Sequence, residues 1–274
     1  MEEKERVCTT IAVCNVGGGT GKTVTAVNLS IGLARHGKRV LLVDLNGSSG
    51  ASTLLIHAPT ANVPISTLMQ QMVIQRTQGV YLCEEEISLE KAILRHKEGI
   101  DIIQSGSDSA QLFLAYDPDY ATVLWEVLRP ARAEYDCIIL DCPPADTFVI
   151  DNALTAADQV LIPVRMNGRA DRQIHNTMRK ILNVKNNYNE ELEILGVLPT
   201  QKTAGLRVSV NEEKELQRIY GQSMVIFPIP VPHSDCVELA NCAGLSLFET
   251  APFDGATMAY EMLVCNVLKA CSSQ

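Results

Sequence analysis

The sequence predicts an α/β fold, a three-layer sandwich whose mostly parallel, twisted sheet of about seven or eight strands carries helices on both faces. Short apolar runs alternate with longer segments of helical periodicity, which is the pattern of consecutive strand–helix–strand units. A glycine-rich loop joins the first predicted strand to the first helix, and two later strands end in aspartate. Ligands of such folds gather at the carboxyl ends of parallel strands, so these features also predict where the site lies.

Apolar runs of strand length define the sheet in chain order. Strands are expected at Thr10–Val16, Arg39–Leu45, Ile100–Gln104, Cys137–Asp141, Gln159–Val164, Leu192–Leu198 and Met224–Ile229. The first helix is predicted from the helical spacing of Val24, Val27, Ile31 and Ala34, and it ends at Gly37. Later helices are expected at Asp146–Ala157, Arg169–Asn187, Arg207–Tyr220 and Gly255–Lys269. Residues 56–98 show the weakest pattern, with helical fragments near Thr67–Val73 and Leu89–His96.

Length and composition favour a single domain that spans residues 1–274. Apolar residues make up 46% of the chain, which is enough for a sizeable core, and no repeat, low-complexity tract or linker divides it. No apolar run approaches the ~18 residues of a membrane span, and the charged start Met1–Arg6 is unlike a signal peptide. We therefore expect a cytoplasmic protein.

The nine cysteines include no C-x-x-C pair. Cys14 and Cys137 lie in predicted strands, where a free cysteine behaves as a small hydrophobic residue. Reduced structural thiols are therefore expected, with a metal or redox centre as the alternative.

The segment Gly17-Gly-Gly-Thr-Gly-Lys-Thr23 follows an apolar strand and opens a helix, the setting that a phosphate-binding loop requires. Glycines let successive backbone N–H groups converge on phosphate oxygens, and the start of the helix adds partial positive charge. Lys22 is expected to neutralise the β- and γ-phosphates of ATP or ADP, and the Thr23 hydroxyl to bind Mg²⁺. The alternative is a glycine-rich turn that binds nothing. The predicted nucleotide contacts are Gly17, Gly18, Gly19, Thr20, Gly21, Lys22, Thr23 and Val24.

Two aspartates at strand ends support the same site. Asp44 ends the run Val40–Asp44, and Asp141 ends the run Ile138–Asp141. Because the carboxyl ends of parallel strands share one edge of the sheet, both acids are expected near the phosphates, where they join Thr23 around Mg²⁺. The alternative is that each acid caps the following helix.

The loop is unlike the common pattern G-x-x-x-x-G-K-S/T, because Val16 stands at its first glycine position. It is similar instead to the loop K-G-G-x-G-K-S/T of the ParA/Soj/MinD family of P-loop ATPases. The segment Val40–Ser52 resembles that family's VLLVDLDPQGNAS. Blocks that resemble its DCPP, NALTAAD and VLIPV motifs and its strand before the adenine pocket are Asp141–Pro144, Asn152–Asp158, Val160–Val164 and Gly196–Thr200.

The resemblance covers most of the chain and is closest to the ParA/Soj partition proteins. It implies the P-loop NTPase fold, binding of ATP or ADP with Mg²⁺, an ATP-dependent homodimer and a ParB-like stimulator protein. It also implies that Thr200 and Gln201, after one strand, and Pro230 and Pro232, after the next, close over the adenine base.

Two departures from the family pattern concern catalysis. The family's lysine that reaches across the dimer to the partner's phosphates is Gly17 here, and the second acid of its D-x-D motif is Asn46. Phosphoryl transfer depends on positioned charge, and loss of one trans-acting cation costs about 10³ in rate. Asparagine orients water through its side-chain oxygen but carries no negative charge. With Lys22, Asp44 and Asn46 as the catalytic group, we expect slow or absent hydrolysis. The alternative is that another residue restores normal turnover.

A basic strip, Arg165–Lys185, supplies candidates for such a residue. It has six lysines and arginines against one acid, Asp171. An arginine of this strip, Arg169 or Arg172, is a candidate for a cation acting in trans on a partner's nucleotide. A solvated helix face is the alternative.

Binding to DNA or to a membrane is less well supported by the sequence. The net charge is −9, and the stretch Val231–Glu238, which matches the family's DNA-binding region, has no arginine. Non-specific DNA binding through the basic strip stays an open alternative. The helix Gly255–Lys269 lacks the basic cluster of a membrane-binding helix, so we expect it to pack against the sheet.

Three functions remain in competition. The first is a ParA-like switch that dimerises on ATP and helps to partition or position a DNA element or complex. The second is a non-catalytic, nucleotide-gated scaffold similar to the TadZ positioning factors of pilus systems. The third is a metabolic enzyme such as a ligase or a dethiobiotin-synthetase relative, although the sequence contains no cluster of polar residues that indicates a substrate pocket.

Overall fold

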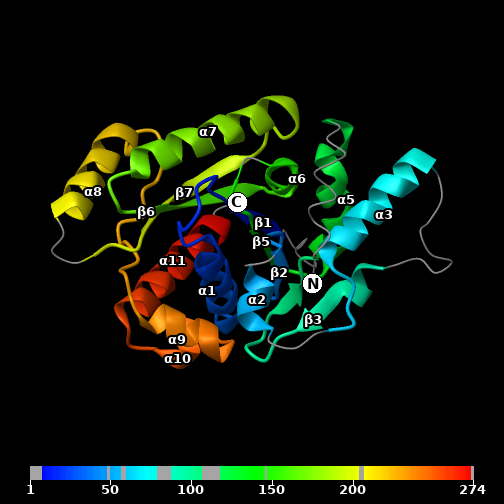
Figure 1. Ribbon diagram of the computed structural model, residues 1–274, viewed down its shortest axis with the longest axis horizontal. Helices are drawn as coiled ribbons and strands as arrows, with labels where there is room; N and C mark the ends of the chain where they lie inside the picture. Colours follow the sequence, from blue (N-terminus) through cyan, green and yellow to red (C-terminus); the bar gives the residue numbers. More distant parts are fainter. Residues whose placement is uncertain are drawn as a thin grey trace, which may run out of the picture.

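A seven-stranded sheet forms the centre of the molecule (Figure 1). The computed structural model describes residues 8–47, 50–56, 60–78, 88–106, 118–145, 147–203 and 207–272. The strands are β1 (Thr9–Val13), β2 (Val40–Asp44), β3 (Ile93–Arg95), β4 (Asp101–Ile103), β5 (Cys137–Asp141), β6 (Gln159–Arg165) and β7 (Glu193–Thr200). Their order is β3-β4-β2-β5-β1-β6-β7, and every pair is parallel except β3 with β4. The predicted mostly parallel sheet is confirmed.

Helices cover both faces of this sheet, as the three-layer prediction requires (Figure 1). Alternate strand residues enter different cores: Ile11 and Val13 lie in one, and Ala12 lies in the other. The first core is closed by α1 (Lys22–Arg35), α2 (Ala51–Leu55), α9 (Cys236–Ala243), α10 (Leu247–Thr250) and α11 (Gly255–Ser272). The second is closed by α3 (Ile65–Gln78), α5 (Val123–Leu128), α6 (Phe148–Ala156), α7 (Ala170–Asn187) and α8 (Arg207–Tyr220).

Two predicted elements are wrong. Met224–Ile229 is not a strand: one bridge joins Ile226 to Val197 of β7. Pro199 of β7 and Pro228 of the segment lack the N–H groups that would continue the ladder.

Leu89–His96 is likewise not a helix. A 3₁₀ turn, η1 (Leu89–Ala92), leads into β3, which pairs antiparallel with β4. Gly99, at φ +86°, closes the turn between the two strands, and the His96 N–H donates to the Ile100 carbonyl at 2.8 Å. A hairpin at the sheet edge therefore replaces the predicted helical fragment.

Several boundaries also differ from the predictions. The strand predicted at Thr10–Val16 ends at Val13, because the buried Asn15 amide leaves the sheet to bond the Pro163 carbonyl. Helix α3 is longer than the predicted Thr67–Val73, and the sequence did not indicate α2, α5, α9, α10 or the 3₁₀ turns η2 (Pro118–Thr122) and η3 (Arg129–Ala133). Asp146, where the next helix was expected to begin, lies outside the described residues.

The last helix packs as predicted. Tyr260, Leu263, Val264 and Val267 of α11 are buried in the core that also contains α1. The two helices lie side by side (Figure 1). Among the described residues, no helix combines the length and apolar character that a membrane crossing needs.

The described cysteines are free thiols, as predicted, while Cys83 lies outside the described residues. Cys14 and Cys137 are buried in the two cores. Burial raises the pKa of Cys8 to about 11 and that of Cys137 to about 12, so both stay protonated near neutral pH.

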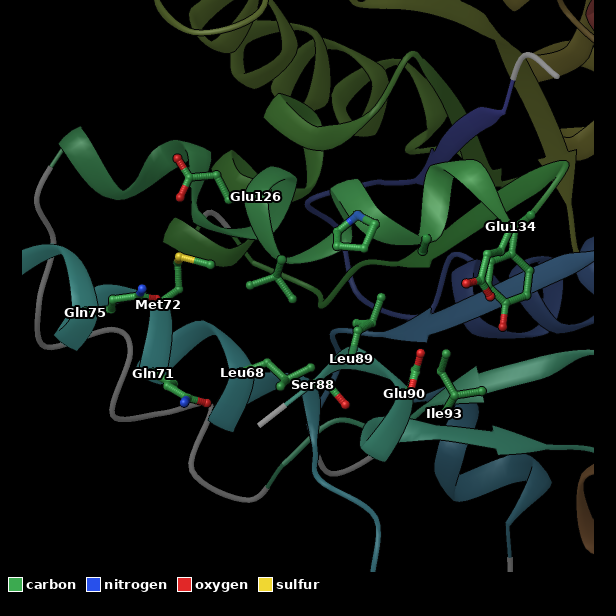
Figure 2. Close-up of a pocket in the computed structure, with 14 residues that line it drawn as sticks. Leu68, Gln71, Met72, Gln75, Ser88, Leu89, Glu90, Ile93, Glu126 and Glu134 are labelled. Carbon is green, nitrogen blue, oxygen red and sulfur yellow. The ribbon is translucent and has the colours of Figure 1, made fainter. Parts of the chain in front are cut away.

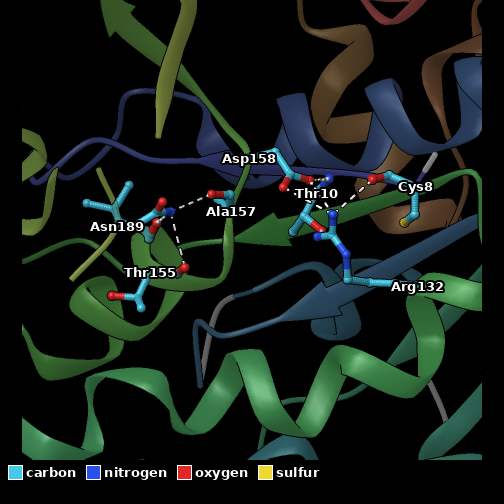
Figure 3. Close-up of polar contacts among 8 residues, drawn as sticks. Cys8, Thr10, Arg132, Thr155, Ala157, Asp158 and Asn189 are labelled. Carbon is cyan, nitrogen blue, oxygen red and sulfur yellow. Dashed lines mark hydrogen bonds and ion pairs between the residues drawn. The ribbon is translucent and has the colours of Figure 1, made fainter. Parts of the chain in front are cut away.

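Side-chain hydrogen bonds connect the amino ends of β1 and β6 (Figure 3). The Arg132 guanidinium donates to the Cys8 carbonyl and to both carboxylate oxygens of Asp158, each at 3.1 Å. Asp158 in turn accepts the Thr10 N–H at 2.7 Å.

The Asn189 amide donates to carbonyls at the end of α6, those of Leu154, Thr155 and Ala157 (Figure 3). These carbonyls lack intrahelical partners.

The variant Asn189→Ala is expected to lower the free energy of unfolding by about 1–3 kcal/mol, because it leaves these half-buried carbonyls unpaired. The melting temperature measured by circular dichroism should fall by about 2–4 °C for each kcal/mol. Asn187→Ala is the matched control, since the exposed Asn187 amide bonds within its own helix at 2.7 Å. Equal melting temperatures for the two variants would contradict the expectation.

Candidate functional site

The glycine-rich loop leaves β1 and enters α1 through two residues with left-handed backbones. Gly19 has φ +65° and Gly21 has φ +84°, conformations that residues with a Cβ rarely adopt. Asn15 begins the turn, since its side-chain oxygen accepts the Gly17 N–H at 2.8 Å while its amide is fixed to the Pro163 carbonyl. Asn15 was not predicted as a site residue, because it fell within the strand expected at Thr10–Val16; a polar side chain in that apolar run was the available signal.

The amino end of α1 is open to an anion. Its N-cap residue, Gly21, has no side chain to occupy the first N–H groups, and the first turn, all of it described, contains no acid. The first helical bond is that from the Thr25 N–H to the Gly21 carbonyl at 2.9 Å. The N–H groups ahead of it are therefore available to phosphate oxygens, as the loop prediction requires.

Lys22 places its ammonium group across the loop. The side chain is buried, and Nζ donates to the Gly17 carbonyl at 2.8 Å. Burial lowers the Lys22 pKa, while the nearby Asp141 carboxyl acts in the opposite direction. A buried ammonium that is bonded to a carbonyl of the loop is well placed to exchange that carbonyl for a phosphate oxygen.

The two predicted metal-site carboxylates lie side by side. Asp44 and Asp141 occupy matched positions on the neighbouring strands β2 and β5, and neither is exposed. The Thr23 hydroxyl donates to Asp141 Oδ1 at 3.3 Å, so the structure brings Thr23 and both acids together. Burial raises the pKa of both carboxyls, and the Asp44 charge adds to the effect at Asp141, whose pKa reaches about 8. Two buried, adjacent acids fit a divalent cation, which would offset the repulsion between their charges.

Residues after β2 hold these carboxylates in place. Asp44 Oδ1 accepts the Asn46 N–H, and Asp44 Oδ2 accepts the Ser52 N–H, both at 2.8 Å; the Ser52 hydroxyl also donates to Oδ2. The Ala51 N–H donates to Asp141 Oδ2 at 3.1 Å. Backbone N–H groups at the start of α2 therefore donate hydrogen bonds to both acids. The roles of Ala51 and Ser52 were missed, although both stand in the Val40–Ser52 block that was noted for its family resemblance.

Asn46 lies next to the carboxylate pair, half-buried, and its backbone makes the bond to Asp44. Its role in positioning water stays a prediction. Ser48 and Ser49 of the same loop lie outside the described residues.

The predicted adenine-site residues are placed differently from one another. Thr200 is buried beneath the loop, where its hydroxyl bonds the Thr20 carbonyl at 2.8 Å, and Gln201 Nε2 donates to the Gly19 carbonyl at 2.9 Å. Both therefore brace the phosphate loop itself. Pro230 and Pro232 are half-buried in the chain beside β7, and Lys202 bridges to Pro232. Contact of these four residues with a base remains a prediction.

A hollow of about 300 Å³ lies between α3, η1 and η3 (Figure 2). Its floor is apolar, including Leu68 and Leu89, and Glu90, Glu126 and Glu134 stand around it. Glu126 is already paired with Arg76. None of the predicted site residues lines this hollow, so it is separate from the phosphate loop.

Comparison with known proteins places the chain in a family. The family model described as an AAA domain matches residues 8–194. The chromosome-partitioning ATPase Soj of Thermus thermophilus is 30% identical over 260 residues, which cover 94% of each chain. The chromosome partitioning protein ParA of Caulobacter vibrioides is 30% identical over 226 residues, 80% of this chain and 79% of that protein. This chain belongs to the ParA/Soj family of P-loop ATPases.

Solved structures agree on the fold. Cobyrinic acid a,c-diamide synthase from Mycobacterium smegmatis, with bound ADP and magnesium, superposes with a TM-score of 0.78 at 23% identity and covers 97% of this chain and 96% of its own. The septum site-determining protein MinD from Pyrococcus horikoshii, complexed with Mg-ADP, gives 0.76 at 20% identity, with coverage of 97% and 98%. At these identities the likeness concerns the fold, and both relatives bind ADP with magnesium.

Proposed function

We propose that this ParA/Soj-family chain is an ATP-binding switch that dimerises on ATP and takes part in partitioning or positioning a DNA element or complex. The observation that carries the proposal is the open amino end of α1, where the buried Lys22 ammonium bonds the loop and the Thr23 hydroxyl bonds Asp141 of the acid pair Asp44 and Asp141. Together these groups provide N–H donors and a cation for phosphates and carboxylates for Mg²⁺.

Slow hydrolysis is part of the proposal. Gly17 supplies no cation to a partner's nucleotide, and Asn46 supplies no negative charge beside the attacking water. The same two residues favour a second candidate, a non-catalytic scaffold similar to TadZ that recruits partners in its ATP state.

Nucleotide binding is tested by isothermal titration calorimetry with Mg-ATP and Mg-ADP. Lys22→Ala is expected to weaken both affinities by about 10- to 100-fold, because a buried charge-assisted bond to phosphate is lost. Lys38→Ala is the control, since Lys38 is exposed and remote from the loop in the sequence. Absence of binding to the wild-type protein, or unchanged affinity in Lys22→Ala, would refute the proposal.

Turnover and assembly separate the two candidates. Phosphate release measured with and without duplex DNA is expected to be slow but saturable for the switch and absent for the scaffold. Sedimentation velocity is expected to show a dimer with Mg-ATP and a monomer with Mg-ADP.

Gel-shift titration against salt tests DNA binding, which should weaken steeply as the salt concentration rises if contacts to DNA phosphates provide the affinity. A ParB-like stimulator would reveal itself as a protein that raises the rate of phosphate release.

A further inference from the structure

A hollow of about 240 Å³ opens beside the first residue of the phosphate loop. Its walls come from the loop and from the start of α7: Val16, Gly17, Arg169, Arg172, Gln173 and Asn176. The Val16 N–H donates to Thr177 Oγ1 at 3.3 Å, and a Cβ added to Gly17 would lie 3.5 Å from Gln173 Cγ, so helix α7 packs against the loop here. Two arginines thus line a space that the loop itself borders.

The hollow adjoins the start of the loop, where the Lys22 ammonium group lies. Lys22, the residue that neutralises β- and γ-phosphates in such loops, bonds the carbonyl of Gly17 at 2.8 Å. Gly17 also borders the hollow and has no side chain to fill it. An anionic group held by the Lys22 ammonium therefore lies next to the space that Arg169 and Arg172 line.

Two acids close to the start of α7 have other partners. Asp171 accepts the Tyr220 hydroxyl at 2.6 Å. Glu212 accepts the N–H groups of Gly168 and Ala170, at 2.9 and 2.7 Å. Within the part of the chain that the structure describes, neither Arg169 nor Arg172 forms an ion pair, and both are exposed. Their positive charge is available to a ligand, in a chain whose net charge is −9.

We propose that Arg169 and Arg172 bind the terminal phosphate of the ATP held by their own chain and so make the site prefer ATP to ADP. This inference rests on the proposed function and adds the residues that distinguish the two nucleotides. ADP leaves the hollow without an anion, whereas the γ-phosphate of ATP brings oxygens that a guanidinium pairs with in a bidentate manner. The arginines supply, from α7, positive charge that Gly17 does not supply from the loop.

Calorimetry on the full chain tests the proposal. The double variant Arg169→Ala/Arg172→Ala is expected to bind Mg-ATP about 10- to 100-fold more weakly than the wild type, while its affinity for Mg-ADP changes by less than about threefold. Arg179→Ala is the matched control, because Arg179 is an equally exposed arginine of α7 that does not line the hollow. It should leave both affinities unchanged.

Each other outcome overturns the inference in a recognisable way. Equal loss of ATP and ADP affinity, or no loss of either, would show that the arginines do not distinguish the γ-phosphate, while the proposed function stands on wild-type binding. Loss of duplex DNA binding at low salt with an unchanged ATP-to-ADP ratio would assign the arginines to DNA phosphates instead. A wild-type protein that bound neither nucleotide would overturn the proposed function as well.

Discussion

Replacing Gly50 with alanine is expected to lower the free energy of unfolding by about 3 kcal/mol and to weaken Mg-nucleotide binding at the same time. A Cβ at position 50 would lie 1.9 Å from Asp44 Oδ1 and 2.4 Å from Asp44 Cγ, and the carboxylate is buried and held by hydrogen bonds. Asp44 would have to give up its bonds to the Asn46 and Ser52 N–H groups, both of 2.8 Å, or the start of α2 would have to move. Either adjustment disturbs the carboxylate pair.

Urea unfolding and calorimetry measure the two effects. Gly18→Ala is the matched control for stability, since a Cβ at Gly18 would meet Pro144 Cβ at an ordinary 3.9 Å. The double variant Gly50→Ala/Asp44→Ala removes the clashing carboxylate, so it should lose about 1–3 kcal/mol less than the sum of the single changes. Additive losses would mean that Gly50 is not constrained by Asp44.

The phosphate loop was predictable because its signal is local. A strand, a run of glycines, Lys22 and a helix follow one another in the sequence, and this order alone indicates the loop, although Thr200 and Gln201 help to hold its backbone in the structure. The acids Asp44 and Asp141 were predictable for a related reason, because parallel pairing brings strand ends to a common edge, and here it puts the two in register.

The features that were missed or mistaken depend on distant partners. The Ala51 N–H becomes a functional group through a bond to Asp141, 90 residues away in the sequence. Leu89–His96 becomes a turn and an edge strand because β4 offers it an open edge, a preference that its own sequence does not express. The position of Arg169 and Arg172 beside Gly17 follows from the packing of α7 against the loop, which the sequence does not express, and a role in trans stays a prediction.

Replacing Asp141 with asparagine is expected to stabilise the protein without nucleotide above neutral pH while weakening Mg-nucleotide binding about tenfold or more. The Asp141 pKa rises from 3.8 to about 8 because of burial and the adjacent Asp44 charge. As pH increases from about 4 to 8, the unfolded chain releases this proton and the folded chain retains it, so stability falls across that window. Asparagine has no proton to release, and it can still accept the Ala51 N–H and donate to the Thr23 hydroxyl.

Melting temperatures at two pH values measure the effect on stability. At pH 8 the variant should melt about 2–6 °C above the wild type, and at pH 4 the difference should vanish. Asp136→Asn is a control of opposite sign: although partial burial raises the Asp136 pKa, hydrogen bonds and charge from Arg39 lower it overall. Its carboxylate therefore stabilises the fold above its unfolded pKa, so the control variant should melt below the wild type at pH 8.

Magnesium distinguishes a metal ligand from an acid that is only buried. Because a divalent cation offsets the repulsion between Asp44 and Asp141, Mg²⁺ with nucleotide should raise the wild-type melting temperature at pH 8 more than that of Asp141→Asn. With EDTA present, the two proteins should bind ATP with similar affinity, since the phosphates then meet the loop without the metal. If Asp141→Asn reduced the affinity for ATP equally with and without Mg²⁺, Asp141 would shape the loop and would not be a ligand of the metal.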